Sequence, residues 1–267
     1  MSDHHPFSPS ALFRLDACPG SYQLCKDLPE VSGDDADRGT AMHNYIAEPM
    51  ARHNLSDADK ATCDRVIDMF VKPFEGKADI FKEYRVSVKD ESGAVLTEGT
   101  ADFVAIAGNI ACLNDWKFGA NQVEDAETNL QMQGYAVGVM QLYPQITRLF
   151  AQVVQPMLGL SFDGQTCFDR SIIPVFIAKI KDIQKRCTAE NAPFNAGEKQ
   201  CRYCRGKNKC DAFKAWIIEH AEALAVKLPD YQLASVEQAD NTLVKCNIVK
   251  KYLENMADAA KEIILQA

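Results

Sequence analysis

The spacing of apolar residues predicts three helices in the first 80 positions. Ser8 as an N-cap, with Pro9 at the first helical position, predicts where the first helix begins. Pro19-Gly20 predicts its end. The acidic, polar segment from Val31 to Arg38 is typical of a loop, so we expect the second helix to begin after it.

The second helix is predicted to carry Met42, His43, Ile46 and Ala47. Ser56, with Asp59 three residues later, resembles a capping box that opens a third helix. The apolar face of this third helix consists of Val66, Ile67, Phe70 and Val71.

From Glu83 the pattern changes to an alternation of apolar and polar residues, which predicts a strand that runs to a turn at 90–93. In chain order, the elements expected next are strands at 95–107 and 110–117, a helix at 126–142, strands at 147–154 and 166–173, and a helix at 175–191. This order predicts a mixed α/β core, a central mixed sheet flanked by helices, with helical additions at both ends.

The C-terminal part has a different character after Leu228-Pro229. A helix start is expected at 235–239 and one long helix at 243–265, with an apolar stripe wide enough to require a packing partner. We therefore expect a domain at 1–228 and a helical extension at 229–267. Three roles for the extension are open: it covers the core, contacts a second copy of the chain, or binds a recombination or replication partner.

Composition limits the compartment and the partners. No apolar stretch is long enough for a membrane span, and the N-terminus lacks a signal-peptide pattern, so we expect a cytoplasmic protein. The net charge of −8 weighs against a nucleic-acid partner, because phosphate binding needs Lys and Arg. Between Lys199 and Lys214, however, six basic residues accompany one acid, so a local phosphate-binding surface and a solvated basic loop are both open.

The hairpin at Gly108-Asn109 predicts a pair of facing carboxylates. If these two residues form the turn, Ala107 faces Ile110, and the same register places Asp102 across from Asp115. Like charges at such positions are destabilising unless a cation lies between them. The alternative is that both aspartates lie at strand ends and face water.

Lys117 leaves the same face of the sheet as Asp115, because it lies two residues further along the strand. Two carboxylates and an ammonium are suited to phosphodiester hydrolysis: the carboxylates bind Mg²⁺, which polarises the phosphoryl oxygen and acidifies a water. Glu83 and Glu98 are further acids near this face and are minor candidates.

Four short motifs occur in an order that resembles the RecB-like branch of the PD-(D/E)XK nucleases. They are Gly39-x-x-x-His43, Gly99-Thr100-Ala101-Asp102-Phe103, Asp115-Trp116-Lys117-Phe118-Gly119 and Gln131-x-x-x-Tyr135. The resemblance implies a restriction-endonuclease-like core and DNA cleavage with Mg²⁺ or Mn²⁺. Asp115 departs from the glutamate that many relatives carry at this position, although both residues occur.

The resemblance also implies roles for single residues. Asp102 and Asp115 would be the main metal ligands, helped by the backbone carbonyl of Trp116, and His43 would complete the site. Lys117 would be the catalytic lysine.

Gln131 and Tyr135, one turn apart on the helix that follows the hairpin, would orient the lysine side of the site and touch DNA.

A cluster of three cysteines, Cys201, Cys204 and Cys210, has the spacing of a metal site and needs a fourth ligand. Cys18 in Cys18-Pro19 is the first choice and Cys25 its rival. This arrangement is similar to RecB-like nucleases with a 4Fe-4S cluster, such as AddB and the CRISPR-adaptation nucleases, and implies such a cluster here. Zinc is the alternative. The other five cysteines are expected to be core or surface residues.

The resulting hypothesis is a Mg²⁺/Mn²⁺-dependent deoxyribonuclease, favoured as an exonuclease on DNA ends or single strands in recombination, replication or DNA processing. A structure-specific endonuclease uses the same centre. A catalytically idle module that binds DNA or a protein is the alternative from another class. The C-terminal pattern resembles a phage-encoded family of RecB-like nucleases, which would place the protein in a bacterial host cytoplasm.

Overall fold

The computed structural model describes residues 5–28, 34–119 and 121–225, and beyond them Leu243, Val244, Cys246, Asn247, Lys250 and Glu254. Apart from those six positions, the helices expected at 235–239 and 243–265 lie outside the described residues. The boundary between 1–228 and 229–267 also lies outside them, so that division stays a prediction. The chain divides into two compact units: residues 1–13 with 31–185 (unit 1), and residues 14–30 with 186–267 (unit 2).

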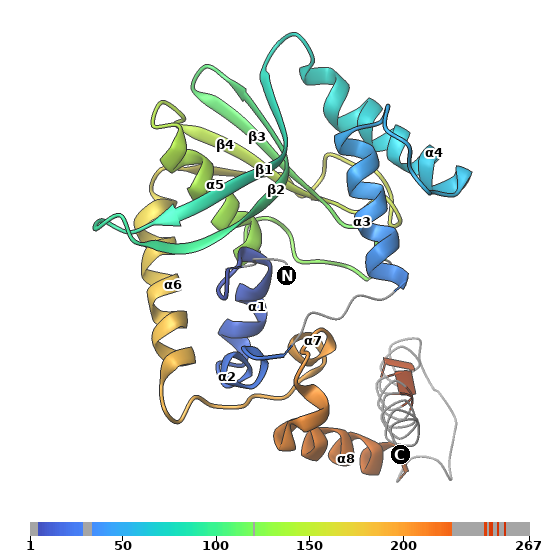
Figure 1. Cartoon of the computed structure of the whole chain (residues 1–267), viewed down its shortest axis with the longest axis vertical. Helices are drawn as coiled ribbons and strands as arrows, with labels where there is room; N and C mark the ends of the chain where they lie inside the picture. Colours follow the sequence, from blue (N-terminus) through green and yellow to red (C-terminus); the bar gives the residue numbers. More distant parts are fainter. Residues whose placement is uncertain are drawn as a thin grey trace. The chain divides into compact units, whose positions relative to one another are not determined.

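Unit 1 is built on a five-stranded sheet (Figure 1). In spatial and chain order the strands are β1 (Asp79–Lys89), β2 (Val95–Ala107), β3 (Ile110–Trp116), β4 (Arg148–Val154) and β5 (Thr166–Asp169). All neighbours are antiparallel except β3 and β4, which are parallel and are connected through α5 (Leu130–Leu142), because a parallel pair needs a crossover. The predicted mixed sheet flanked by helices is confirmed.

The remaining helices precede and follow the sheet in the sequence. They are α1 (Pro9–Ala17), α2 (Ser21–Cys25), α3 (Asp34–Ala47), α4 (Asp57–Val66), the π-helix η1 (Ile67–Val71), the 3₁₀ helix η2 (Lys72–Phe74), α6 (Ile172–Thr188), α7 (Glu198–Arg202), the 3₁₀ helix η3 (Lys207–Lys209) and α8 (Asp211–Ala225). No helix among the described residues has the length and apolar character needed to cross a membrane.

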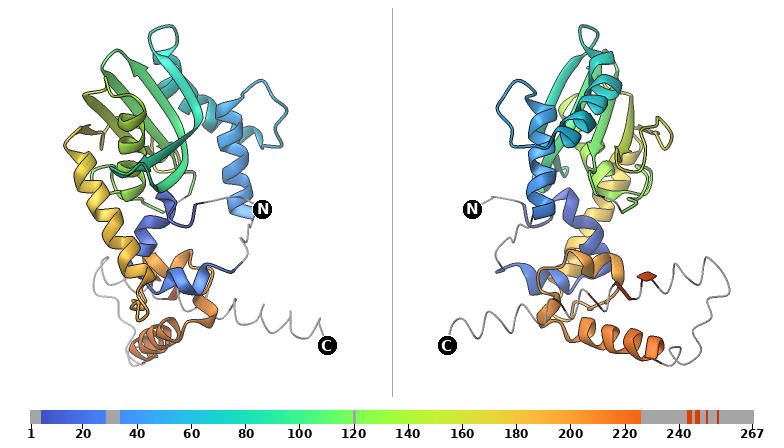
Figure 2. Two further views of the ribbon diagram at one scale, coloured as in Figure 1. Left: turned by 60° about the vertical axis from the view of Figure 1, so that its left-hand side comes forward. Right: turned by 90° about the vertical axis from the view of Figure 1, so that its right-hand side faces the viewer.

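Each face of the sheet has its own apolar core, because successive side chains on a strand point to opposite faces. Val104 and Leu113 pack with Met132 and other residues of α5 on one face. Phe103 and Trp116 pack with α3, α4 and η1 on the other face. Figure 2 shows α3 and α4 together on one side of the sheet.

The expectation of a loop from Val31 to Arg38 is wrong for residues 34–38, because α3 begins at Asp34, and residues 31–33 lie outside the described residues. The Arg38 guanidinium, in the first turns of α3, bonds to both carboxylate oxygens of Asp59 in α4. Acidic residues also favour a helix N-terminus. The predicted cap of the third helix is confirmed, because the Asp59 N–H donates to Ser56 Oγ at 3.1 Å.

Two other boundaries differ from those expected. α5 begins at Leu130 rather than at 126, because the Asn129 side chain accepts hydrogen bonds from the N–H groups of Gln131 and Met132 as an N-cap. β5 ends at Asp169 rather than at 173. There the Asp169 carboxylate accepts from the Ser171 N–H, and α6 starts at Ile172, three residues before its expected start.

Gly99 on β2 lies where there is no room for a side chain. A Cβ there would come within 2.8 Å of the Pro9 ring and 3.2 Å of Tyr135. We predict that Gly99→Ala lowers the free energy of unfolding by about 1–3 kcal/mol, because the ring and the aromatic must move apart. Urea unfolding followed by circular dichroism measures the change.

The matched control is Gly39→Ala in α3, where a Cβ would meet nothing within 4 Å. It should stabilise the fold by about 0.5–1 kcal/mol, since glycine is unfavourable inside a helix. Equal effects of both variants would contradict the packing argument.

Candidate metal centre

The β2–β3 hairpin has the register that the sequence predicts. Ala107 pairs with Ile110, and the pairing continues to Phe103 opposite Asn114, so Asp102 and Asp115 are next at the end of the hairpin. Gly108 has a φ of +61°, which a glycine adopts without strain at the first central position of a two-residue turn. Both carboxylates are buried, Asp115 with 1% exposure, so the alternative in which they face water is wrong.

Asp102 is fixed by the neighbouring strand and by a histidine. The Trp116 backbone N–H donates to Asp102 Oδ2 at 2.6 Å. The other oxygen, Oδ1, lies 3.3 Å from His43 Nδ1. His43 comes from α3 and packs edge-on against the Phe118 ring, with 5.4 Å between the ring centroids. The structure thus joins the α3 histidine to the sheet carboxylate, as the motif resemblance implies.

Glu83 of β1 completes a group of three potential cation ligands. One ligand atom each from His43, Glu83 and Asp102 lies within 4.8 Å of the other two. Glu83 Oε1 is 3.9 Å from His43 Nδ1. Carboxylate oxygens and imidazole nitrogens are ligands for Mg²⁺ and Mn²⁺, so this group is suited to a divalent cation.

The backbone of Glu83 is strained. Its φ of +47° is the only positive value of a non-glycine residue within the described ranges. The pairs Lys82–Phe103 and Tyr84–Ala101 flank it, so it lies across from Asp102. Backbone strain of this kind costs about 1–3 kcal/mol and clusters at functional sites. The other minor candidate, Glu98, forms an ion pair with Arg85 and is not in the group.

The remaining residues of the motifs surround Asp115. Lys117 Nζ forms an ion pair with Asp115 Oδ2 at 2.8 Å. Gln131 Nε2 donates to Asp115 Oδ1 at 2.9 Å and also contacts the Tyr135 hydroxyl at 3.3 Å. Of the i, i+4 pair on α5, Gln131 thus contacts the carboxylate with which Lys117 is paired, and Tyr135 contacts Gln131. Lys117 is 30% exposed, so its ammonium can reach a molecule in the solvent.

The acids of the site disfavour one another's ionisation. Burial, with a contribution from the Asp102 charge, raises the pKa of Asp115 to about 6, although Lys117 opposes the shift. Burial and then the charge of Asp102 raise the pKa of Glu83. For His43, burial lowers the pKa, but the hydrogen bond and charge of Asp102 outweigh it, so the net shift is upward. A divalent cation would relieve this repulsion.

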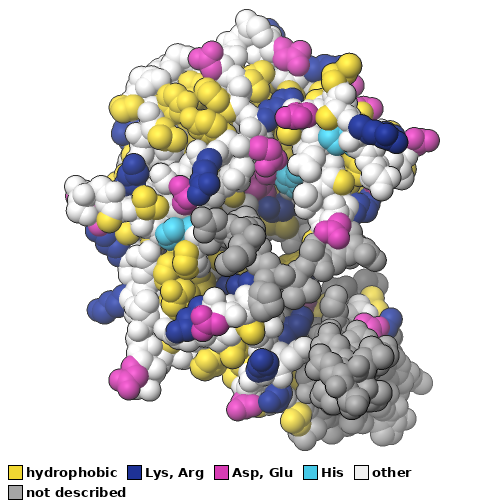
Figure 3. Space-filling view, in the orientation of Figure 1, with side chains coloured by type: hydrophobic (Ala, Val, Ile, Leu, Met, Phe, Trp, Pro, Cys, Tyr) yellow, Lys and Arg dark blue, Asp and Glu magenta, His cyan; other side chains and the backbone are white. Residues whose placement is uncertain are grey.

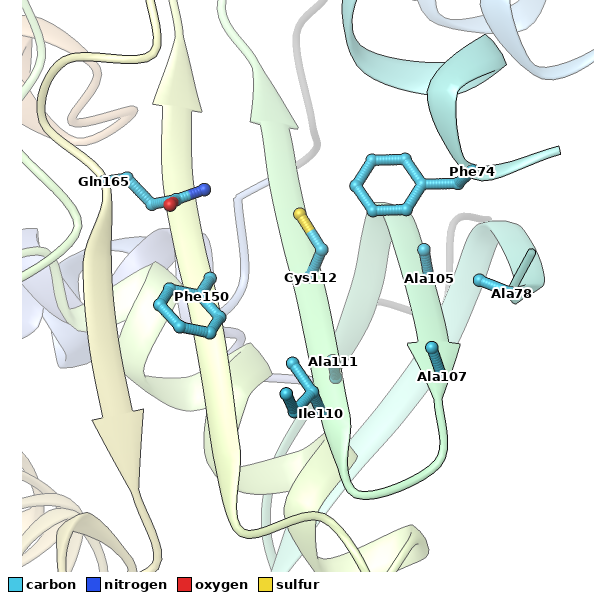
Figure 4. Close-up of a pocket in the computed structure, with 9 residues that line it drawn as sticks. All are labelled: Phe74, Ala78, Ala105, Ala107, Ile110, Ala111, Cys112, Phe150 and Gln165. Carbon is cyan, nitrogen blue, oxygen red and sulfur yellow. The ribbon is translucent and has the colours of Figure 1, made fainter.

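The space-filling view shows acidic side chains gathered beside a histidine and a basic side chain near the middle of unit 1 (Figure 3). A separate hollow of about 240 Å³ lies at the hairpin end of the strands (Figure 4). It is lined by apolar residues together with Cys112 and Gln165, and it includes none of the acids. The acids of the candidate centre therefore lie outside this hollow.

The cysteines of the predicted metal cluster lie in unit 2. Cys18, Cys201 and Cys204 are buried and Cys210 is half-buried. The N–H of Asn195 donates to Cys18 Sγ at 3.3 Å, and the N–H of Gly197 donates to Cys201 Sγ at 3.4 Å.

The rival ligand Cys25 is also buried, and its sulfur lies 3.6 Å from that of Cys204. A hydrogen bond from Cys204 lowers the pKa of the Cys25 thiol to about 6. Within the described ranges, no three cysteine sulfurs lie within 4.8 Å of one another.

The basic residues around these cysteines make contacts inside unit 2. Arg202 pairs with Glu198 at 2.5 Å and Lys214 with Asp211 at 2.9 Å. Lys207 donates to the Arg202 carbonyl at 3.1 Å. Much of this charge therefore serves local structure, and a phosphate-binding role of the segment stays a prediction.

The comparison with known families covers most of the chain. Residues 48–266 match the family described as "Protein of unknown function (DUF2800)". The chain belongs to the DUF2800 family. The matched range includes Glu83, Asp102, Asp115 and Lys117, whereas His43 precedes it.

A solved structure from Eubacterium rectale, described as a "Putative exonuclease", is similar to this DUF2800 member with a TM-score of 0.45 and 10% sequence identity. The match covers 78% of this chain and 87% of that chain.

The acidic group makes a prediction about cation binding. We expect Mn²⁺ to raise the melting temperature of the wild type, because a ligand at 100 times its Kd adds about 2.7 kcal/mol of stability. Asp102→Asn should abolish the increase and Glu83→Gln should reduce it, since each removes a charged ligand. Differential scanning fluorimetry with and without Mn²⁺ measures the shift.

Glu98→Gln is the matched control for Glu83→Gln, because it neutralises a glutamate on the neighbouring strand β2 that pairs with Arg85. Its Mn²⁺ response should equal that of the wild type. Loss of the response in this variant, or its retention in Asp102→Asn, would contradict the assignment.

Proposed function

We propose that the protein is a divalent-cation-dependent deoxyribonuclease with a PD-(D/E)XK centre. The observation that carries this proposal is the convergence of His43, Glu83 and Asp102 in one group, with Asp115 and Lys117 beside it. Asp115 is buried and burial raises its pKa, and carboxyl groups with perturbed pKa values cluster at functional sites. The order of the four sequence motifs supports the same centre.

The residues would divide the work as follows. His43, Glu83, Asp102 and Asp115 would hold Mg²⁺ or Mn²⁺, with the Trp116 carbonyl as a further ligand. The bound cation supplies Lewis-acid polarisation of the phosphoryl oxygen and acidifies a water.

Lys117, whose ammonium is partly exposed, supports the nucleophile or the charge that develops in the transition state. Gln131 holds the Asp115 carboxylate in place, and Tyr135 holds Gln131.

Cys18, Cys201, Cys204 and Cys210 would hold a 4Fe-4S cluster in unit 2. Sulfurs of a tetrahedral zinc site with Zn–S bonds of 2.3 Å lie about 3.8 Å apart. Within the described ranges no three cysteine sulfurs approach one another within 4.8 Å, and a cluster, in which each thiolate binds a different iron, does not require them to. The N–H donors to Cys18 and Cys201 suit thiolate ligands.

Cleavage of DNA tests the proposed centre. We expect the wild type to cut DNA with Mg²⁺ or Mn²⁺, and Asp115→Asn and Lys117→Ala to lose at least about 100-fold of the rate, as when transition-state electrostatics are removed. A gel assay with labelled linear and circular DNA measures the rates. Lys181→Ala, which removes a lysine that pairs with Asp90 and Glu91, should cut at the wild-type rate.

The same assay separates the modes of action. Degradation of linear DNA with survival of the circle supports the favoured exonuclease, and cutting of the circle supports an endonuclease. DNA binding without cleavage in the wild type would identify an idle binding module and end the enzymatic proposal.

The cluster has a spectroscopic test. Protein purified without oxygen should have a broad visible absorbance, and Cys201→Ser and Cys210→Ser should lose it, because each removes one of four ligands. Cys63→Ser, at a buried cysteine of unit 1, should keep it. Colourless wild-type protein that contains zinc would contradict the iron–sulfur assignment.

A further inference from the structure

Cys25 is a fifth thiol beside the proposed four-cysteine centre. It is the last residue of α2, and its sulfur lies 3.6 Å from that of Cys204, which follows α7. Both side chains are buried, with 2% and 6% exposure. Because the proposed centre takes its four ligands from other cysteines, Cys25 has no role in it.

The contact between these cysteines is part of a larger contact between two segments of unit 2. Arg205, next to Cys204, donates to the carbonyls of Cys25 at 3.2 Å and of Leu28 at 2.8 Å. Gly206 packs so closely on α2 that a Cβ would overlap the Leu24 side chain. Three consecutive residues therefore hold the backbone around Cys204 against the end of α2, and the two sulfurs face each other as a consequence.

The pair is also selective. A third described cysteine sulfur within 4.8 Å of both is absent. A disulfide needs a sulfur–sulfur distance of about 2.05 Å, so the two side chains must approach by rotation about their χ angles. The 3.6 Å separation therefore favours a disulfide between these two sulfurs.

We propose that Cys25 and Cys204 are an oxidation site that forms a disulfide with hydrogen peroxide. One thiol attacks the peroxide O–O bond and becomes a sulfenic acid, and water leaves. The second thiol attacks the sulfenic sulfur, which forms the S–S bond and releases a second water. Two electrons pass from the thiols to the peroxide, and both thiol protons leave in the waters.

The bond has a consequence for the metal centre, and this consequence rests on the proposed function. A disulfide at Cys204 removes one of the four proposed ligands, so the oxidised chain cannot complete the cluster. A thiol reductant restores the ligand. The crosslink itself requires neither the cluster nor nuclease activity.

The protein's own trypsin sites make the crosslink assignable. Cleavage after Arg202, Arg205, Lys209 and Lys214 places Cys201, Cys204 and Cys210 on the separate peptides 200–202, 203–205 and 210–214. Cys18 and Cys25 share the peptide 15–26. The full chain, stripped of metal by a chelator, is treated with hydrogen peroxide, alkylated, digested without reductant and measured by mass spectrometry.

We expect peptide 15–26 joined to peptide 203–205 in the wild type and in Cys18→Ser, with a yield at least about tenfold lower in Cys25→Ser and Cys25→Ala. Circular dichroism confirms that each variant is folded. A crosslink to peptide 200–202 or 210–214, a crosslink that survives in both Cys25 variants, or full alkylation of Cys204 after peroxide would overturn the proposal.

Loading with iron and sulfide then separates this proposal from the proposed function. Visible absorbance that forms in the reduced chain, fails in the oxidised chain and returns after thiol treatment supports the consequence for the centre. Equal loading of both chains contradicts it. No loading of the reduced chain counts against the cluster and leaves the crosslink result intact.

Discussion

The register between β2 and β3 is the constraint on which the candidate centre depends. A slip of one residue would turn Asp102 and Asp115 to the opposite face of the sheet, because side chains alternate along a strand. The buried pair of Val104 and Leu113 prevents the slip, since both are fully enclosed against α5. The apolar core thus determines where the charged groups lie.

Burial in the same core makes the centre unfavourable for the free energy of folding. Asp115 is buried, and its contacts with Lys117 and Gln131 do not restore the ordinary pKa. Glu83 adds a strained backbone and a third acid. Burying charge and straining a backbone both oppose folding, so a chain selected for stability alone would not combine them. The combination is better explained by a requirement for a cation.

What the sequence could predict was local. The hairpin turn fixed the positions of Asp102 and Asp115 because only two residues separate the strands, and the helical spacing of Gln131 and Tyr135 placed both on one face. Glu83 was only a minor candidate, because its place depends on the pairing of β1 with β2 and on a positive φ that no local pattern signals. His43 was predicted only from the motif resemblance. Its contact with Asp102 joins segments about 60 residues apart and depends on tertiary packing, which no local pattern predicts.

In unit 2, the spacing of the cysteines alone does not identify all the ligands of the predicted metal site. The spacing of Cys201, Cys204 and Cys210 indicated a metal site, and counting ligands then left Cys18 and Cys25 as rivals for one position. The structure gives them different neighbours: Cys18 accepts the N–H of Asn195, whereas Cys25 accepts the N–H of Gly206 and also faces the Cys204 thiol. Our two proposals give each cysteine a different role: Cys18 would be the fourth ligand of the metal centre, and Cys25 would form the disulfide that removes Cys204 from it.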